Sequence, residues 1–148
     1  MTPSSSQALS RAAALMSTAL ALSASPARAA AGTLELQVDN VGSAEGSLMI
    51  ALYDKAGDWR DRPVRSLQQV ARPGSVTVTF ADLPPGSYAI ALYHDRNGNG
   101  KLDSNVMGIP REPYGFSGKA PTMGPANWEQ ARFEVPAAGA RVVVKLSD

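Results

Sequence analysis

The sequence contains no cysteine and only one histidine, His94, among its 148 residues. Without cysteine the chain can form no disulfide, no thiolate zinc or iron–sulfur site, and it has no cysteine nucleophile. With one imidazole it cannot form any site that needs two. The formal net charge of +1 lacks the positive excess that is typical of nucleic-acid-binding proteins. Nucleic acid is therefore not expected as a partner.

The sequence also lacks an apolar run long enough to span a membrane. Its longest run covers residues 12–22, about eleven residues, whereas a hydrocarbon core of ~30 Å needs about 20. An A-x-A cleavage site follows at residues 27–29. Residues 1–30 are therefore predicted to be a secretory signal peptide. Residues 31–148 are then one exported domain, in the periplasm or outside the cell. The alternative is an amphipathic helix of the mature fold.

Beyond the apolar run, a period of two dominates the sequence. Apolar residues alternate with polar or small ones over residues 34–38, 48–53, 76–80 and 88–93, and two shorter runs follow near the C-terminus. The prolines lie between these runs rather than within them. The pattern predicts an all-β fold: a single antiparallel β-sandwich of about 6–8 strands, transthyretin- or immunoglobulin-like.

Three details of this fold can be read from shorter segments. Residues 64–71 form either a short edge strand or one helical turn, and residues 137–139 suit a hairpin loop. The segment at 46–53 returns in part at 86–93, with Ile-Ala-Leu-Tyr at the end of both copies. This similarity indicates two strands in similar core environments. It would place Tyr53 and Tyr93 on one face of a sheet.

Two parts of the chain resemble known families. Residues 80–90 (Phe-Ala-Asp-Leu-Pro-Pro-Gly-Ser-Tyr-Ala-Ile) resemble the strand–turn–strand element of transthyretin-like sandwiches, with Leu83 closing the end of the core. Residues 94–103 (His-Asp-Arg-Asn-Gly-Asn-Gly-Lys-Leu-Asp) and 108–117 (Gly-Ile-Pro-Arg-Glu-Pro-Tyr-Gly-Phe-Ser) together resemble domain-of-unknown-function family 2141, a bacterial family of small exported proteins. This second resemblance implies export and a β-rich fold. It implies no reaction.

Residues 95–103 also match the first nine positions of an EF-hand-type calcium loop. The candidate ligands are the side chains at positions 1, 3, 5 and 9 and the carbonyl at position 7: Asp95, Asn97, Asn99, Asp103 and Lys101. The glutamate expected at position 12 is replaced by Val106, so further ligands would have to come from Asn105, Glu112 or another loop. The sequence predicts weak calcium binding, with a Kd of roughly 10⁻⁴–10⁻³ M. The alternative is that the two Asn-Gly pairs only form a turn.

The second candidate site is the loop 108–117, which is stiffened by two prolines. Tyr114 and Phe116, together with Trp128, could present a surface for a ligand or a partner. The alternative is that these aromatic side chains cover one end of the core.

These observations favour an exported, non-enzymatic module that binds an extracellular or envelope protein. One alternative is a carbohydrate-binding module that presents the same aromatic side chains or Trp59 to a glycan. A less favoured alternative is a small hydrolase that uses the carboxylates of Asp95, Asp103 or Glu112. The sequence singles out no catalytic residue and predicts calcium as the one possible cofactor.

Overall fold

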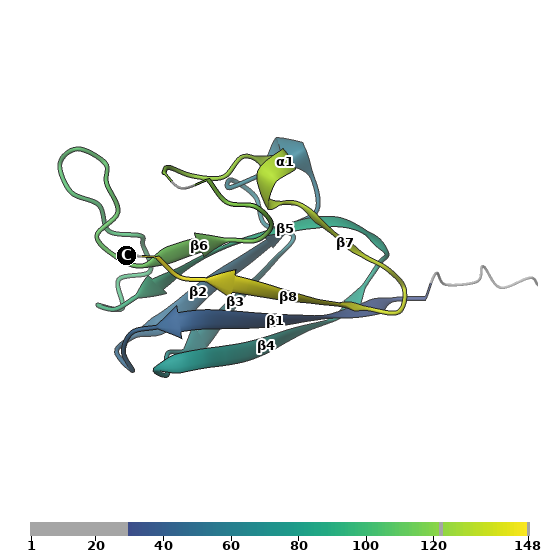
Figure 1. Ribbon diagram of the computed structural model, residues 1–148, viewed down its shortest axis with the longest axis horizontal. Coiled ribbons are helices and arrows are strands. Elements are labelled where there is room, and N and C mark those ends of the chain that lie inside the picture. Colours follow the sequence, from purple (N-terminus) through teal and green to yellow (C-terminus); the bar gives the residue numbers. More distant parts are fainter. Residues whose placement is uncertain (1–29, 122, 148) are drawn as a thin grey trace, which may run out of the picture.

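The structure is a computed structural model that describes residues 30–121 and 123–147. The predicted signal peptide lies outside the described residues, apart from Ala30. The described chain forms two β-sheets packed face to face, which confirms the predicted all-β sandwich (Figure 1). The three-stranded sheet has the order β4-β1-β8 and is made of β1 (Gly32–Val41), β4 (Gly74–Leu83) and β8 (Ala140–Lys145). The five-stranded sheet has the order β3-β2-β5-β6, with β7 also paired to β5, and is made of β2 (Ser47–Tyr53), β3 (Arg65–Val70), β5 (Gly86–Asp95), β6 (Tyr114–Phe116) and β7 (Phe133–Val135).

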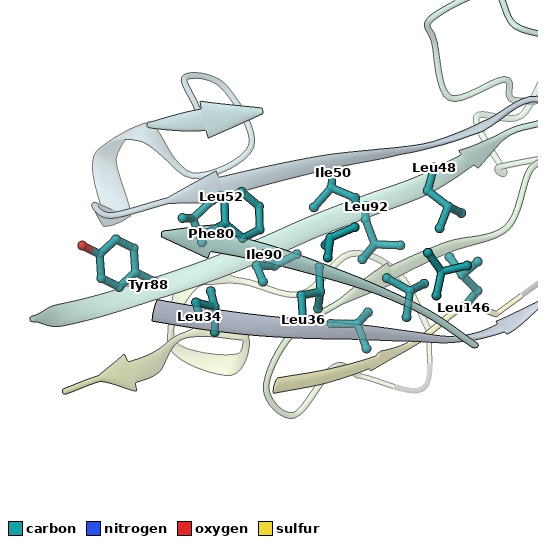
Figure 2. Close-up of a cluster of buried hydrophobic side chains, with 14 of the residues drawn as sticks. Leu34, Leu36, Leu48, Ile50, Leu52, Phe80, Tyr88, Ile90, Leu92 and Leu146 are labelled. Carbon is teal, nitrogen blue, oxygen red and sulfur yellow. The ribbon is translucent and has the colours of Figure 1, made fainter. Parts of the chain in front are cut away.

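The core lies between the two sheets and follows the alternation in the sequence. Figure 2 shows Leu36 from β1 and Ile50 and Leu92 from β2 and β5 in one apolar layer, and each is at most 3% exposed. Burying a side chain of this size stabilises a fold by about 1.5–3 kcal/mol. Leu83 is 2% exposed and belongs to the same core, as the turn at residues 80–90 predicted. The Tyr88 hydroxyl donates to the Pro84 carbonyl at 2.7 Å and closes that turn.

Strand pairing differs from the prediction in two places. The pair β1–β8 is parallel, although the sandwich was predicted to be antiparallel. The predicted hairpin at residues 137–139 is wrong, because β7 pairs with β5 whereas β8 pairs with β1 in the other sheet. The chain therefore crosses from one sheet to the other at this point. A period of two reports which side chains face the core, but it carries no information about the direction or the partner of a strand.

The predictions for residues 64–71 and for the repeated segment both concern the five-stranded sheet. Residues 65–70 form the edge strand β3, not a helical turn. The two copies of the short repeat are β2 and β5, which are antiparallel neighbours with Ala51 paired to Ala91. Tyr53 and Tyr93 are on the outward face of this sheet, as predicted, since their register matches that of the outward Ala51 and Ala91.

Loops and short helices cover parts of this outward face (Figure 1). The loop between β5 and β6 lies at one end. The other end carries the short helices η1 (Ala56–Asp58) and α1 (Trp128–Ala131). No helix among residues 30–121 and 123–147 combines the length and the apolar character that crossing a bilayer requires.

Candidate binding groove and candidate calcium loop

A groove of about 1130 Å³ lies on the outward face of the five-stranded sheet. Its floor is made of side chains that stand side by side on neighbouring strands. Met49 on β2 is paired with Tyr93 on β5, which is paired in turn with Tyr114 on β6. In the next row, Ala51 is paired with Ala91, which leaves the floor low at that point because both side chains are small.

Two segments form the sides of the groove. One side consists of Leu102, Ser104 and residues 108–110, which belong to the loop between β5 and β6. The other consists of Arg60 and residues 123–125, whose chain neighbours Trp59 and Ala126 are joined by a hydrogen bond. Several apolar side chains in these segments are unusually exposed. Leu102 is 37% exposed, Ile109 54% and Met123 88%. Val106 and Met107, in the same loop as Ile109, are more exposed than Ile109. Because exposed apolar side chains gather around a concavity here, the groove is the candidate interaction site.

An aromatic cluster supports the groove beside Phe116. The Trp59 ring packs against the rings of Tyr53, Phe116 and Trp128 with centroids 5.0, 6.0 and 6.1 Å apart. Its indole Nε1 donates to the Ala126 carbonyl at 2.9 Å, which fixes the ring. Of the three aromatic residues predicted as a ligand surface, Tyr114 and Phe116 line the groove. Trp128 packs against Trp59 instead.

The segment predicted as a loop at 108–117 is partly a strand. Residues 114–116 form β6, which pairs with β5 through Ala91, Leu92 and Tyr93. This pairing is what brings Tyr114 and Phe116 onto the groove floor. The short strand has little sequence of its own to show a period of two, which is why the sequence alone favoured a loop.

The turn at 95–103 is organised by the carboxylate of Asp95, which is 2% exposed. Its Oδ1 accepts from the backbone N–H groups of Gly98 and Asn99 at 2.9 and 3.2 Å, and its Oδ2 accepts from Gly100 at 2.7 Å. Gly98 and Gly100 have φ values of 72° and 74°, a region that favours glycine. One buried carboxylate thus holds three consecutive amides of the turn.

Glu112, which lies outside the turn in the sequence, joins its two ends. This residue is 6% exposed, and its Oε1 and Oε2 accept from the backbone N–H groups of Arg96 and Asp103 at 2.9 and 3.1 Å. Asn105, the other residue considered as an additional ligand, accepts from the backbone N–H groups of Met107 and Ile109. Both side chains therefore hold backbone in place. Sequence reasoning gave Glu112 no such role, since the ends of the turn meet it only in the folded chain.

Asp103 is joined to the two asparagines of the turn. Its carboxylate accepts from Nδ2 of Asn97 at 2.5 Å and from Nδ2 of Asn99 at 2.9 Å. These hydrogen bonds lower the pKa of Asp103, the bond from Asn99 most. Asp103 is therefore ionised over a wider pH range than an ordinary aspartate. In the described part of the chain, no three His, Cys, Asp or Glu side chains are grouped so as to hold a metal ion. Any cation at this turn would depend on amide and carbonyl oxygens as well.

Replacing Asn99 with alanine is expected to raise the pKa of Asp103 toward the ordinary value of 3.8, because the largest cause of its lowering is removed. A carboxylate with a lowered pKa stabilises the fold above its unfolded pKa, and this stabilisation is lost as the pH falls through the folded pKa. The Asn99 variant should therefore lose less stability in acid. Titration of the Asp103 carboxyl carbon by NMR measures the shift. Asn105→Ala is the control, and an unchanged pKa in Asn99→Ala would contradict the assignment.

The turn and the groove are linked through Tyr93. The Tyr93 ring lies on the groove floor, and its hydroxyl donates to the Gly100 carbonyl at 2.9 Å. Burial raises the pKa of Tyr93, and the charges of Asp95 and Glu112 raise it further. The hydroxyl thus remains protonated and able to donate. This bond joins the turn to the groove floor, and Leu102 of the turn lines the groove side.

Sequence reasoning missed half of the groove. It did not single out Met49, Ala51, Ala91, Arg60 or Met123. A clue was present in the repeated Ile-Ala-Leu-Tyr segment, where both alanines occupy outward positions between larger side chains. Their adjacency, however, depends on the pairing of β2 with β5.

The fold and the groove define a β-sandwich domain with a ligand-sized apolar concavity on the outer face of one sheet. The chain belongs to the family described as "Uncharacterized protein conserved in bacteria (DUF2141)", which matches residues 36–143. This match confirms the resemblance of residues 94–103 and 108–117 to that family. No curated protein and no solved structure matches the chain. The resemblance of residues 80–90 to transthyretin-like sandwiches is therefore not confirmed.

Proposed function

We propose that this protein is an exported, non-enzymatic binding module that holds its ligand in the groove on the five-stranded sheet. The observation that carries the proposal is the concavity of about 1130 Å³, floored by aromatic and small side chains and bordered by exposed apolar ones. Pockets for small molecules commonly measure about 300–1,000 Å³ and are mostly apolar. Export is supported by the apolar run and cleavage site near the N-terminus.

The chemistry of the groove also supports binding rather than catalysis. Its described lining contains no carboxylate and no imidazole, the usual general acids and bases. The buried carboxylates nearby, Asp95 and Glu112, are occupied by backbone N–H groups. The groove thus offers apolar surface and a few hydrogen-bonding groups to a ligand.

Filling the groove floor should weaken the binding of a neutral apolar probe. Ala91→Leu adds a large side chain between Ala51 and Phe116, its direct neighbours in the sheet. We expect Nile red, followed by its fluorescence, to bind the variant at least about tenfold more weakly, or ~1.4 kcal/mol. Ala81→Leu makes the same change at an exposed position on β4 and is the control. Equal binding by both variants, or no binding by the unmodified protein, would refute the proposed function.

We further propose that the turn 95–103 binds calcium and thereby steadies the neighbouring segment 104–117. The support is the donor set. Hydrogen bonds link Asn97, Asn99 and Asp103 in one group, with Asp95 at the base of the same turn. Calcium prefers such oxygen ligands, and the Lys101 carbonyl would add another. Two carboxylates favour weak binding, in the range that suits an extracellular module.

Calcium should raise the thermal unfolding midpoint of the protein relative to the same sample in EDTA. At tenfold excess over Kd, an ion that binds only the folded state stabilises it by ~1.4 kcal/mol, which is a rise of roughly 4–8 °C for a domain of this size. Magnesium should have a smaller effect. Asp103→Asn should remove the rise, whereas Asp61→Asn, on an exposed loop, should keep it. No rise at about 10 mM calcium, well above the expected Kd, would refute calcium binding.

A further inference from the structure

The described lining of the groove is charged at one place only. Among its described lining residues, Arg60 is the one with a charged side chain, and it lies on the same side as Met123 and Pro125. The opposite side presents Leu102 and Ile109, which are exposed and apolar. A ligand that complements this surface has an apolar body and a single negative charge.

Arg60 is not occupied by a partner within the described chain, unlike the arginines near it. Arg62 pairs with Asp58 at 2.6 Å and approaches Asp61 at 3.9 Å. Arg65 donates to the backbone carbonyls of Ala81 and Asp82. Asp58 is thus engaged by Arg62, whereas the ion pair between Asp61 and Arg62 is long and exposed. The Arg60 guanidinium is exposed.

The backbone holds Arg60 in an uncommon conformation. Its φ is 67°, which costs a residue other than glycine about 1–2 kcal/mol. Such a conformation persists where the surroundings impose it. Here the preceding residue, Trp59, is fixed by three aromatic contacts and by its bond to Ala126. The aromatic cluster therefore fixes the backbone position from which the Arg60 side chain extends at the end of the groove.

The floor of the groove suits a hydrocarbon chain better than a sugar. Met49, Ala51 and Ala91 offer no side-chain hydrogen bonds. The Tyr93 hydroxyl already donates to Gly100. The polar lining residues Ser66 and Gln68 lie on the edge strand β3, beside Ala51 and Met49. Over the alanines themselves a glycan would leave hydroxyl groups without side-chain partners, and such groups are costly to bury. A flexible methionine adapts to an alkyl chain.

Building on the proposed function, we propose that the groove binds a long-chain carboxylate, with the alkyl chain over Ala51 and Ala91 and the carboxylate on Arg60. A guanidinium can hold a carboxylate by two parallel hydrogen bonds. The chain would lie in the low part of the floor, beside the row of Met49 and Tyr93 and along the row that continues from Ala91 to Phe116.

The test compares decanoate with 1-decanol, which has the same chain but no charge. Both are added to the protein below their aggregation concentrations, and binding is followed by calorimetry and by the fluorescence of Trp59 and Trp128. Decanoate is expected to bind at least about tenfold more tightly, a difference of ~1.4 kcal/mol. Arg60→Gln should remove this preference and Arg60→Lys should reduce it, because lysine keeps the charge but not the two parallel donors. Arg62→Gln should leave it unchanged.

Three results would overturn the inference while leaving the proposed function intact. One is equal binding of decanoate and decanol that Ala91→Leu abolishes. Another is a preference for decanoate that survives Arg60→Gln. An acidic apolar peptide or a glycan that displaces Nile red, where decanoate does not, would also overturn it. If neither decanoate, decanol nor Nile red binds, the proposed function itself fails.

Discussion

Replacing Gly46 with alanine is expected to lower the free energy of unfolding by about 3–5 kcal/mol, among the largest effects of single substitutions. A Cβ at this position would lie 1.9 Å from the backbone carbonyl oxygen of Asp95. The φ of Gly46 is 62°, which adds strain for any other residue. The close approach has a visible cause, because Nε2 of His94 lies 2.7 Å from the Glu45 carbonyl and holds this segment against the end of β5.

Substitutions at two other glycines distinguish the cost of backbone strain from the cost of steric overlap. Gly74 has a φ of 97° but nothing within 4 Å of an added Cβ, so Gly74→Ala should cost only about 1 kcal/mol. Gly115 has no positive φ, but an added Cβ would lie 2.8 Å from Val144 Cγ1 and 2.9 Å from the Lys145 carbonyl. Gly115→Ala should therefore fall between the two. Denaturant unfolding of the three variants measures the order, and a Gly46 variant no worse than Gly74→Ala would contradict the packing argument.

Replacing Asp95 with alanine is expected to cost about 2–4 kcal/mol and to disorder the turn that follows. Three backbone N–H groups, those of Gly98, Asn99 and Gly100, lose their acceptor at once. Each unsatisfied group costs about 1–3 kcal/mol when buried, and less where water can reach it. Because the Gly100 carbonyl accepts from Tyr93, the groove side should loosen too. Nile red binding should therefore weaken together with stability.

Asp95→Asn keeps the size of the side chain and one oxygen acceptor, so it should lose less stability than Asp95→Ala. Asp61→Ala is the control for removing a negative charge: its side chain is 82% exposed and its ion pair with Arg62 is long, so a change within about 0.5 kcal/mol is expected. Hydrogen exchange of the Gly98 and Gly100 amides reports the turn directly. Unchanged protection of these amides in Asp95→Ala would show that the carboxylate does not organise the turn.

Both substitutions act at the junction of β5 with the turn 95–103. Gly46 allows the backbone at the start of β2 to approach this junction, and Asp95 and Glu112 convert it into a closed turn. The junction sets the position of Leu102 and of the rest of that side of the groove. The proposed binding site on the sheet face thus depends on residues that do not line it.

The sequence by itself determined the fold class, the core and the family. Alternation of apolar residues is enough to identify which side chains meet between two sheets, because successive residues of a strand point to opposite faces. It placed Leu36, Ile50 and Leu92 in the core, and the structure confirms this. The motifs at 94–103 and 108–117 were enough to identify the family, which matches residues 36–143.

The groove was decided only by the tertiary structure. Its floor requires that β2 pair with β5 and β5 with β6, and its lining combines Arg60 with residues 123–125, which are far away in the sequence. The parallel pairing of β8 with β1 was likewise invisible in the pattern. Periodicity is a local property that reports the orientation of a side chain relative to its own strand. Pairing and loop placement depend on contacts between residues far apart in the chain, and those contacts exist only once the whole core has packed.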